Sequence, residues 1–117
     1  MSYLWIFVGG GMGSMLRYTL ARYFNTTGDY PWGTLLANGL SCILLGALLA
    51  MVTKDWLSAE LRLLLVTGFC GGFSTFSTFS NEVFVFMKNA QYVAAALYLL
   101  GSIIIGLTGI WVGMKLG

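Results

Sequence analysis

Four long apolar stretches, separated by short polar segments, make up most of the chain. They cover about residues 3–23, 32–52, 61–87 and 92–114. Each is long enough to cross a bilayer, which takes a helix of about 20 apolar residues. The pattern predicts an all-α membrane protein in which residues 1–117 form a single domain of four transmembrane helices.

The composition supports a chain that lies in lipid. Of its 117 residues, 58% are apolar and 9% are charged, whereas a soluble domain has roughly 25% charged residues. The absence of histidine excludes imidazole catalysis, and the two cysteines are too few for the usual zinc, haem or iron–sulfur sites. Cys42 and Cys70 fall in mid-span, where we expect small apolar packing residues. We expect neither an enzyme nor a nucleic-acid-binding protein.

The positive charges are nearly balanced across the predicted membrane. Four spans put both termini and the loop 53–60 on one side. That side has three basic residues, Lys54, Arg62 and Lys115. The opposite side has Arg22 and Lys88, and also Arg17 if that residue lies close enough to the membrane surface. Orientation normally follows an excess of Lys and Arg in the cytoplasmic loops. The balance favours insertion in both orientations and head-to-tail pairing, although a chain this short can also reach it by chance.

Residues 68–82 form a polar run inside the third apolar stretch. They include two adjacent glycines, five hydroxyl side chains and a carboxylate. Bent backbone at membrane depth is tolerated only where protein buries it or a wet cavity adjoins it. We therefore predict that the third helix is broken at Gly71-Gly72. Carbonyl groups freed there need protein donors or a hard cation as partners, and two chains meeting at their breaks would supply twice as many.

Three polar side chains are costly at membrane depth, namely Arg17, Asn38 and Glu82. A charge at the centre of a spanning helix costs about 2.5–3.5 kcal/mol on insertion scales. Arg17 either extends to the interface or attracts anions to the mouth of a pathway. Asn38 either bonds a neighbouring helix or donates to a ligand. Glu82 lies near the end of its span, where it could mark the interface.

After the predicted break, Phe76 and Phe79 share a helix face and hydroxyl residues flank them. Such phenylalanines are usually packing residues. Because an aromatic ring has a positive edge, ring edges together with hydroxyl and amide donors can also hold a small anion. The residues alone indicate a polar, bent site for a small ion, and they do not identify the ion.

The run 68–82 resembles the signature of the fluoride channels called Fluc or CrcB. Further matches extend over nearly the whole chain: Gly13 and Arg17-Tyr18 in the first stretch, Gly33-Thr34, Asn38 and Gly46 in the second, and Tyr98 with Ser102 in the fourth. The resemblance implies a dual-topology, antiparallel homodimer in the bacterial plasma (inner) membrane. It also implies passive fluoride conduction that lowers cytoplasmic fluoride, with a structural sodium ion at the dimer centre.

The resemblance assigns roles to twelve residues. The fluoride pathway would be formed by Thr34, Asn38, Phe76, Ser77, Thr78, Phe79, Tyr98 and Ser102; the vestibules would hold Arg17 and Glu82; and sodium would bind the backbone carbonyls of Gly71 and Ser74. One departure is Gly106, one turn after Ser102, where we expect another hydroxyl. Water or Thr108 would have to compensate for it.

Three other functions are alternatives to a fluoride channel. A small multidrug exporter has a similar length and span count, but it needs a carboxylate in the first span, and residues 3–23 contain none. A membrane assembly subunit without transport does not require the costly polar run. A cation channel would use the freed carbonyls alone.

Overall fold

The computed structural model describes residues 2–24, 31–74 and 76–117. All regular secondary structure within these ranges is helical, which confirms the predicted all-α class. The elements are α1 (Ser2–Phe24), α2 (Trp32–Thr53), α3 (Ala59–Arg62), the π-helix η1 (Leu63–Cys70), α4 (Gly71–Phe73), α5 (Phe76–Lys88) and α6 (Tyr92–Leu116).

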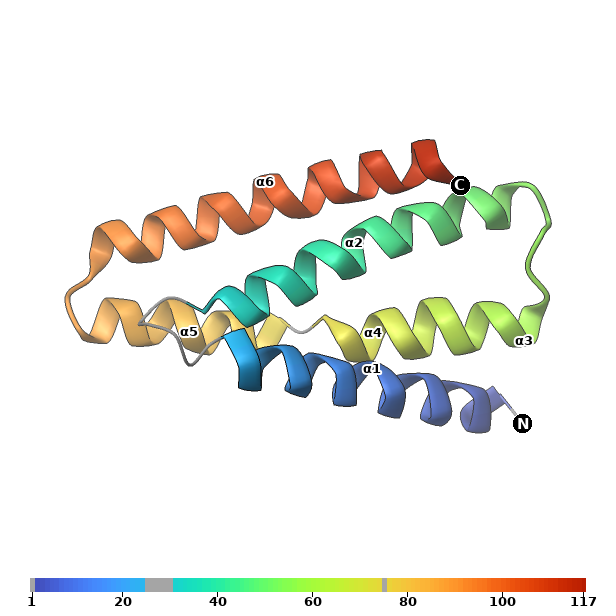
Figure 1. The fold of residues 1–117 in the computed structure, drawn as a ribbon, viewed down its shortest axis with the longest axis horizontal. Coiled ribbons are helices and arrows are strands. Elements are labelled where there is room, and N and C mark those ends of the chain that lie inside the picture. The colour runs from blue at the N-terminus through green and yellow to red at the C-terminus, as the bar shows by residue number, and fades with distance from the viewer. Residues whose placement is uncertain (1, 25–30, 75) are drawn as a thin grey trace.

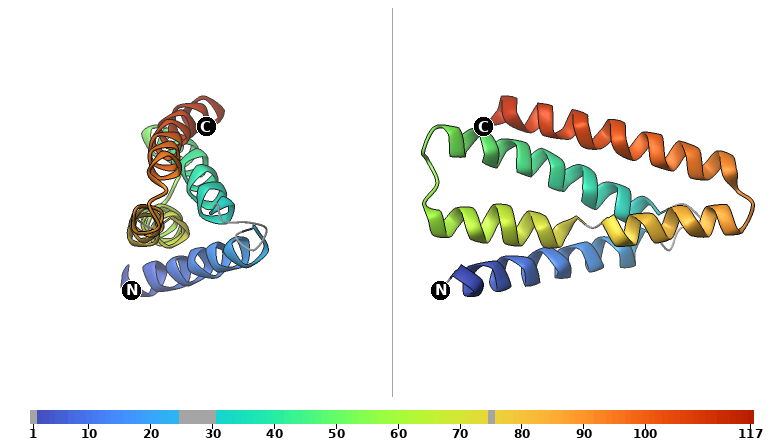
Figure 2. Two further views of the ribbon diagram at one scale, coloured as in Figure 1. Left: turned by 90° about the vertical axis from the view of Figure 1, so that its left-hand side faces the viewer. Right: turned by 180° about the vertical axis from the view of Figure 1, so that it is seen from behind.

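These elements form four helical rods along the long axis of a molecule that measures 47 × 28 × 20 Å. One rod is composite, because α3, η1, α4 and α5 follow one another along nearly the same line (Figure 1). Both termini lie at the same end as the turn between α2 and α3, as predicted (Figure 1). Seen end-on, α1 and α6 lie at opposite sides of the arrangement, with α2 and the composite rod between them (Figure 2).

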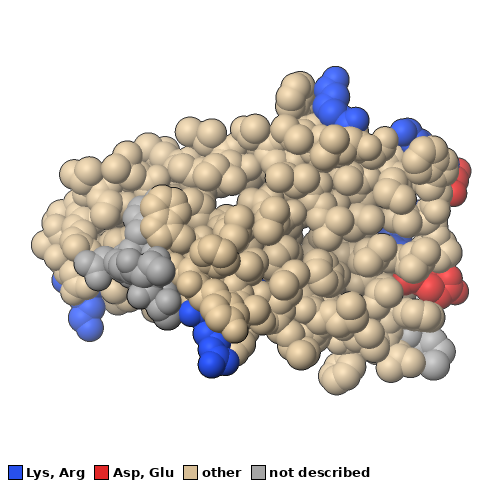
Figure 3. Space-filling view, viewed as in Figure 1, with Lys and Arg blue, Asp and Glu red and all other residues tan. Residues whose placement is uncertain are grey.

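The exterior is apolar, as expected for a protein that lies in a bilayer. Many large apolar side chains face outward, among them Phe7 at 78% and Ile104 at 63% exposure, whereas Tyr98 is the one large side chain in the described residues that is fully buried. Most charged side chains lie towards the two ends of the long axis (Figure 3).

Three of the four predicted spans are long and apolar enough to cross a membrane: Trp32–Thr53, Ala59–Lys88 and Tyr92–Leu116. The remaining helix, α1, has 23 residues and is not among them. At 1.5 Å per residue α1 is about 35 Å long, so its length would suffice. Its glycines and two arginines lower its hydropathy, and its crossing remains a prediction.

The break in the third rod lies later than predicted. Gly71 and Gly72 are helical, and the chain becomes extended at Ser74 (φ −101°, ψ 150°), before α5 begins at Phe76. Gly72 serves close packing instead, because a Cβ atom on it would collide with the carbonyl oxygen of Gly10. The prediction of a break at Gly71-Gly72 is therefore wrong by about three residues. Gly72 marks where α1 approaches, not where the helix ends.

Gly13 of α1 lies against the same rod. A Cβ atom there would collide with the Phe69 carbonyl oxygen and approach the Phe73 nitrogen to 2.7 Å. Because backbone atoms yield less than side chains do, we expect Gly13→Ala to destabilise the fold by about 1–3 kcal/mol. Thermal unfolding in detergent measures this. Gly11→Ala is the control, since nothing lies within 4 Å of that position; equal melting temperatures for both variants would contradict the close packing.

Candidate functional site

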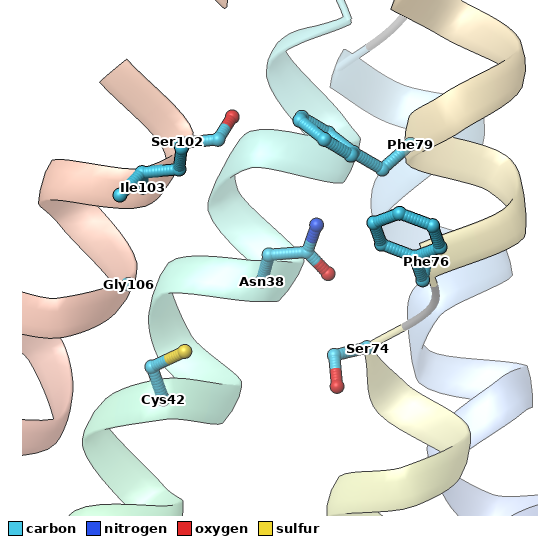
Figure 4. A pocket seen from close by; sticks show the side chains of 8 residues that line it. All are labelled: Asn38, Cys42, Ser74, Phe76, Phe79, Ser102, Ile103 and Gly106. Atoms are coloured by element: carbon cyan, nitrogen blue, oxygen red, sulfur yellow. The ribbon is translucent and has the colours of Figure 1, made fainter. Parts of the chain in front are cut away.

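A pocket of about 300 Å³ lies between α2, α6 and the break in the third rod. Its walls bring together side chains that are far apart in the sequence (Figure 4). They are Asn38 and Cys42 from α2, Ser74 at the break, Phe76 and Phe79 from α5, and Ser102, Ile103 and Gly106 from α6. Four residues predicted for the pathway thus meet in one place: Asn38, Phe76, Phe79 and Ser102.

Aromatic rings continue from this pocket into the core of the fold. The centroids of Phe76 and Phe79 are 6.2 Å apart, and Phe79 lies 5.1 Å from Tyr98, with tilted planes in both pairs. Phe86 meets Tyr98 edge-on at 6.0 Å. Phe76 is 81% exposed, whereas Tyr98 is fully buried. The rings therefore form a row that leads inward from the open side of the pocket.

Two polar atoms in the pocket are buried without a hydrogen-bond partner among the described residues. They are Oδ1 of Asn38 and Oγ of Ser102. Leaving a buried polar group unpaired costs about 1–3 kcal/mol, so such atoms normally have a ligand or water beside them. The Asn38 side chain points into the space between Phe76, Phe79 and Ser74 (Figure 4). Rotation of its amide by half a turn presents either oxygen or NH₂ donors to that space.

Beyond Phe79, a carboxylate joins three elements. Oε2 of Glu82 accepts a hydrogen bond from Thr34 Oγ1, and Oε1 accepts one from the Tyr98 hydroxyl, both at 2.9 Å. Thr34 and Tyr98 are 2% and 0% exposed. The resemblance implies a vestibule position for Glu82 and pathway positions for the other two residues, and these roles stay predictions. The structure joins all three in one hydrogen-bonded group.

The helix end before the break has protein donors for its carbonyl groups. Arg17 Nε donates to the Gly72 carbonyl oxygen at 3.1 Å. The Cys70 carbonyl oxygen accepts from the hydroxyls of Ser74 at 3.0 Å and Ser41 at 3.3 Å. Arg17 is half-buried and sits at the carboxyl end of a helical stretch, where a cation is favoured. Cation binding by the carbonyls of Gly71 and Ser74 stays a prediction.

Comparison with known proteins identifies the family. Residues 4–114 match the family described as "CrcB-like protein, Camphor Resistance (CrcB)". The chain belongs to this family. It is 43% identical over 115 residues to a protein of Phocaeicola vulgatus named "Fluoride-specific ion channel FluC", covering 97% of this chain and 95% of the relative.

Two further relatives bear the same name. One, from Oceanobacillus iheyensis, is 41% identical over 112 residues, covering 95% of this chain and 87% of the relative. The other, from Pyrococcus abyssi, is 36% identical over 114 residues, covering 97% and 93%. The matches span nearly the full length on both sides. With its long apolar helices, this CrcB-like chain is a multi-pass membrane protein.

The pocket of this CrcB-like chain differs in part from the predicted site. Ser77 and Thr78 lie on α5 outside the pocket lining, Ser77 exposed and Thr78 half-buried. Cys42 and Ile103 line it and were not predicted to do so. The sequence does indicate that Cys42 lies beside Asn38. Cys42 follows Asn38 by four residues, so the two side chains share one face of the helix. The position of Cys42 in mid-span instead indicated a packing residue.

Proposed function

We propose that this protein is a fluoride channel that conducts the ion passively across the membrane and lowers cytoplasmic fluoride. The observation that carries the proposal is the pocket at the break, where two aromatic rings and unpartnered polar atoms meet in a chain whose relatives are named fluoride-specific ion channels. The pocket has the donor types that a small anion requires. These are the edges of Phe76 and Phe79, the amide of Asn38 and the hydroxyl of Ser102.

Conduction requires that these groups replace the water around fluoride without holding the ion too tightly. Ring edges and neutral donors provide moderate attraction, and the described lining contains no lysine or arginine. Arg17 lies at the helix end that precedes the break. Its Nε bond to Gly72 leaves the terminal nitrogens of the guanidinium as further donors, and its charge would raise the local concentration of anions.

The driving force is the electrochemical gradient of fluoride itself. A negative interior favours exit of an anion by about 2.3 kcal/mol per charge for each 100 mV. The described lining contains no carboxylate that would couple fluoride to a proton, because Glu82 lies beyond Phe79 in its own hydrogen-bonded group. Passive conduction needs no such coupling.

The proposed working form is an antiparallel homodimer with four spans per subunit, α1 included. The nearly balanced charges support insertion in both orientations. Phe76, at 81% exposure, lies where a second subunit could cover it. A sodium ion would be held at the dimer centre by the carbonyls of Gly71 and Ser74, two from each subunit. The mass of the purified protein by light scattering, and fluoride flux with sodium replaced by a bulky organic cation, test these two points.

The function is tested by fluoride efflux from liposomes that contain the purified protein. A potassium ionophore is added to carry the counter-charge, and a fluoride electrode follows the external concentration. We expect rapid release of fluoride and no comparable release from chloride-loaded liposomes. Release at the rate of protein-free liposomes from a well-folded preparation would overturn the proposed function.

A further inference from the structure

The pocket contains a polar side chain that the fluoride proposal does not use, the thiol of Cys42. Cys42 lies on α2 one turn after Asn38, on the same face of the helix, and both side chains line the pocket (Figure 4). The thiol is half-buried, whereas the other cysteine, Cys70, is 4% exposed and is not part of the lining. Only the first of the two cysteines therefore faces the pocket.

In the pocket lining, Cys42 lies next to Gly106, the glycine that departs from the expected pattern. A Cβ atom on Gly106 would lie 3.5 Å from the Cys42 Sγ atom, an ordinary van der Waals contact. On α6, the residues one and two turns earlier are Ser102 and Tyr98, so Gly106 is the point where that line of hydroxyls ends. Thr108 does not compensate, because it is exposed and lies outside the lining.

Further support comes from the unpaired atoms of the same pocket. Asn38 Oδ1 and Ser102 Oγ are buried without partners among the described residues, which indicates that a small polar guest belongs beside them. Cys42 and Gly106 each lie one turn beyond one of these two residues, on the same two helices. A guest that moves along the pocket from Asn38 and Ser102 therefore next reaches Cys42, which lies against Gly106.

We propose that Cys42 is a residue of the ion pathway, where its thiol takes the place of the side chain that Gly106 lacks. The inference rests on the proposed fluoride conduction. The S–H group is a weak donor, so Cys42 gives the ion a polar contact at this level without holding it strongly. The thiol also makes this point of the pathway sensitive to reagents that bind sulfur.

The first test compares fluoride efflux from liposomes among variants of residue 42. We expect Cys42→Ser to conduct at least as well as the unmodified chain, and Cys42→Val to lose roughly five- to tenfold in rate, the range for one weak donor to an anion. Adding Gly106→Ser to Cys42→Val should recover most of the rate, because the space at Gly106 admits a Cβ atom. Equal rates for the serine and valine variants would overturn the assignment.

The second test uses Hg²⁺, which forms a sulfur–mercury bond while the thiol proton passes to water. Hg²⁺ should block the unmodified chain and Cys70→Ala, and it should leave Cys42→Ser conducting. Block of Cys42→Ser, or no block of Cys70→Ala, would overturn the inference. If the unmodified chain itself releases no fluoride, the proposed function fails first, so the two failures are distinguishable.

Discussion

Fluoride efflux is expected to fall to the background of protein-free liposomes when Phe76 is replaced by isoleucine. The ring of Phe76 stands at the open side of the pocket, 6.2 Å from Phe79. Isoleucine retains an apolar side chain of moderate size but has no aromatic edge. If ring edges replace part of the water around the anion, the ion loses this contact at the entrance to the pocket.

The same substitution should have little effect on folding, since Phe76 is 81% exposed in the single chain. Substitutions at exposed positions usually change stability by less than about 0.5 kcal/mol. Phe84→Ile is the matched control, because Phe84 lies on the same helix, is 62% exposed and is not part of the pocket. A Phe76→Ile protein that still releases fluoride at the original rate would contradict the role of the ring.

The bounds of the long apolar helices could be predicted from the sequence, because each helix coincides with an apolar stretch of about the length that crosses a bilayer. The expected stretch 32–52 corresponds to Trp32–Thr53 and the expected stretch 92–114 to Tyr92–Leu116. The position of the break could not be predicted in the same way. Adjacent glycines allow both a bend and a close helix contact, and only the position of α1 beside Gly72 decides between them.

The pocket could be predicted in part. Asn38, Phe76, Phe79 and Ser102 were expected to lie together, and they do. That expectation came from the resemblance, because helix periodicity does not say which faces of three separate helices meet. Cys42 was missed since a cysteine in mid-span is normally a packing residue. Its place in the pocket lining follows from how α2, α5 and α6 pack together.

The hydrogen-bonded group around Glu82 could not be predicted from the sequence either. Thr34 and Glu82 are 48 residues apart, and Tyr98 follows Glu82 by 16. A carboxylate near the end of a span is more simply explained as an interface marker. In the structure it accepts from two buried hydroxyls, so it links α2, α5 and α6 at the level where the aromatic row ends. This position makes Glu82 a structural residue that links the three helices.

Glu82→Leu is therefore expected to destabilise the fold strongly. The substitution removes the acceptor of two buried hydroxyl groups, and losing a buried partner costs about 1–3 kcal/mol for each. We expect the melting temperature in detergent to fall by at least about 5 °C. Glu82→Gln keeps a carbonyl oxygen and adds an NH₂ group that hydroxyls can accept from, so it should retain most of the stability.

A triple variant distinguishes the contribution of the two hydrogen bonds to stability from the contribution of the size and charge of the Glu82 side chain. Removing the partners together with the acceptor is nearly neutral when shape is kept. Glu82→Leu combined with Thr34→Val and Tyr98→Phe should thus recover much of the stability that Glu82→Leu alone loses. Recovery would assign the loss to unpaired hydroxyls. If the triple variant is less stable than Glu82→Leu, the carboxylate does not act through these two bonds, and the link between the three helices lies in their packing.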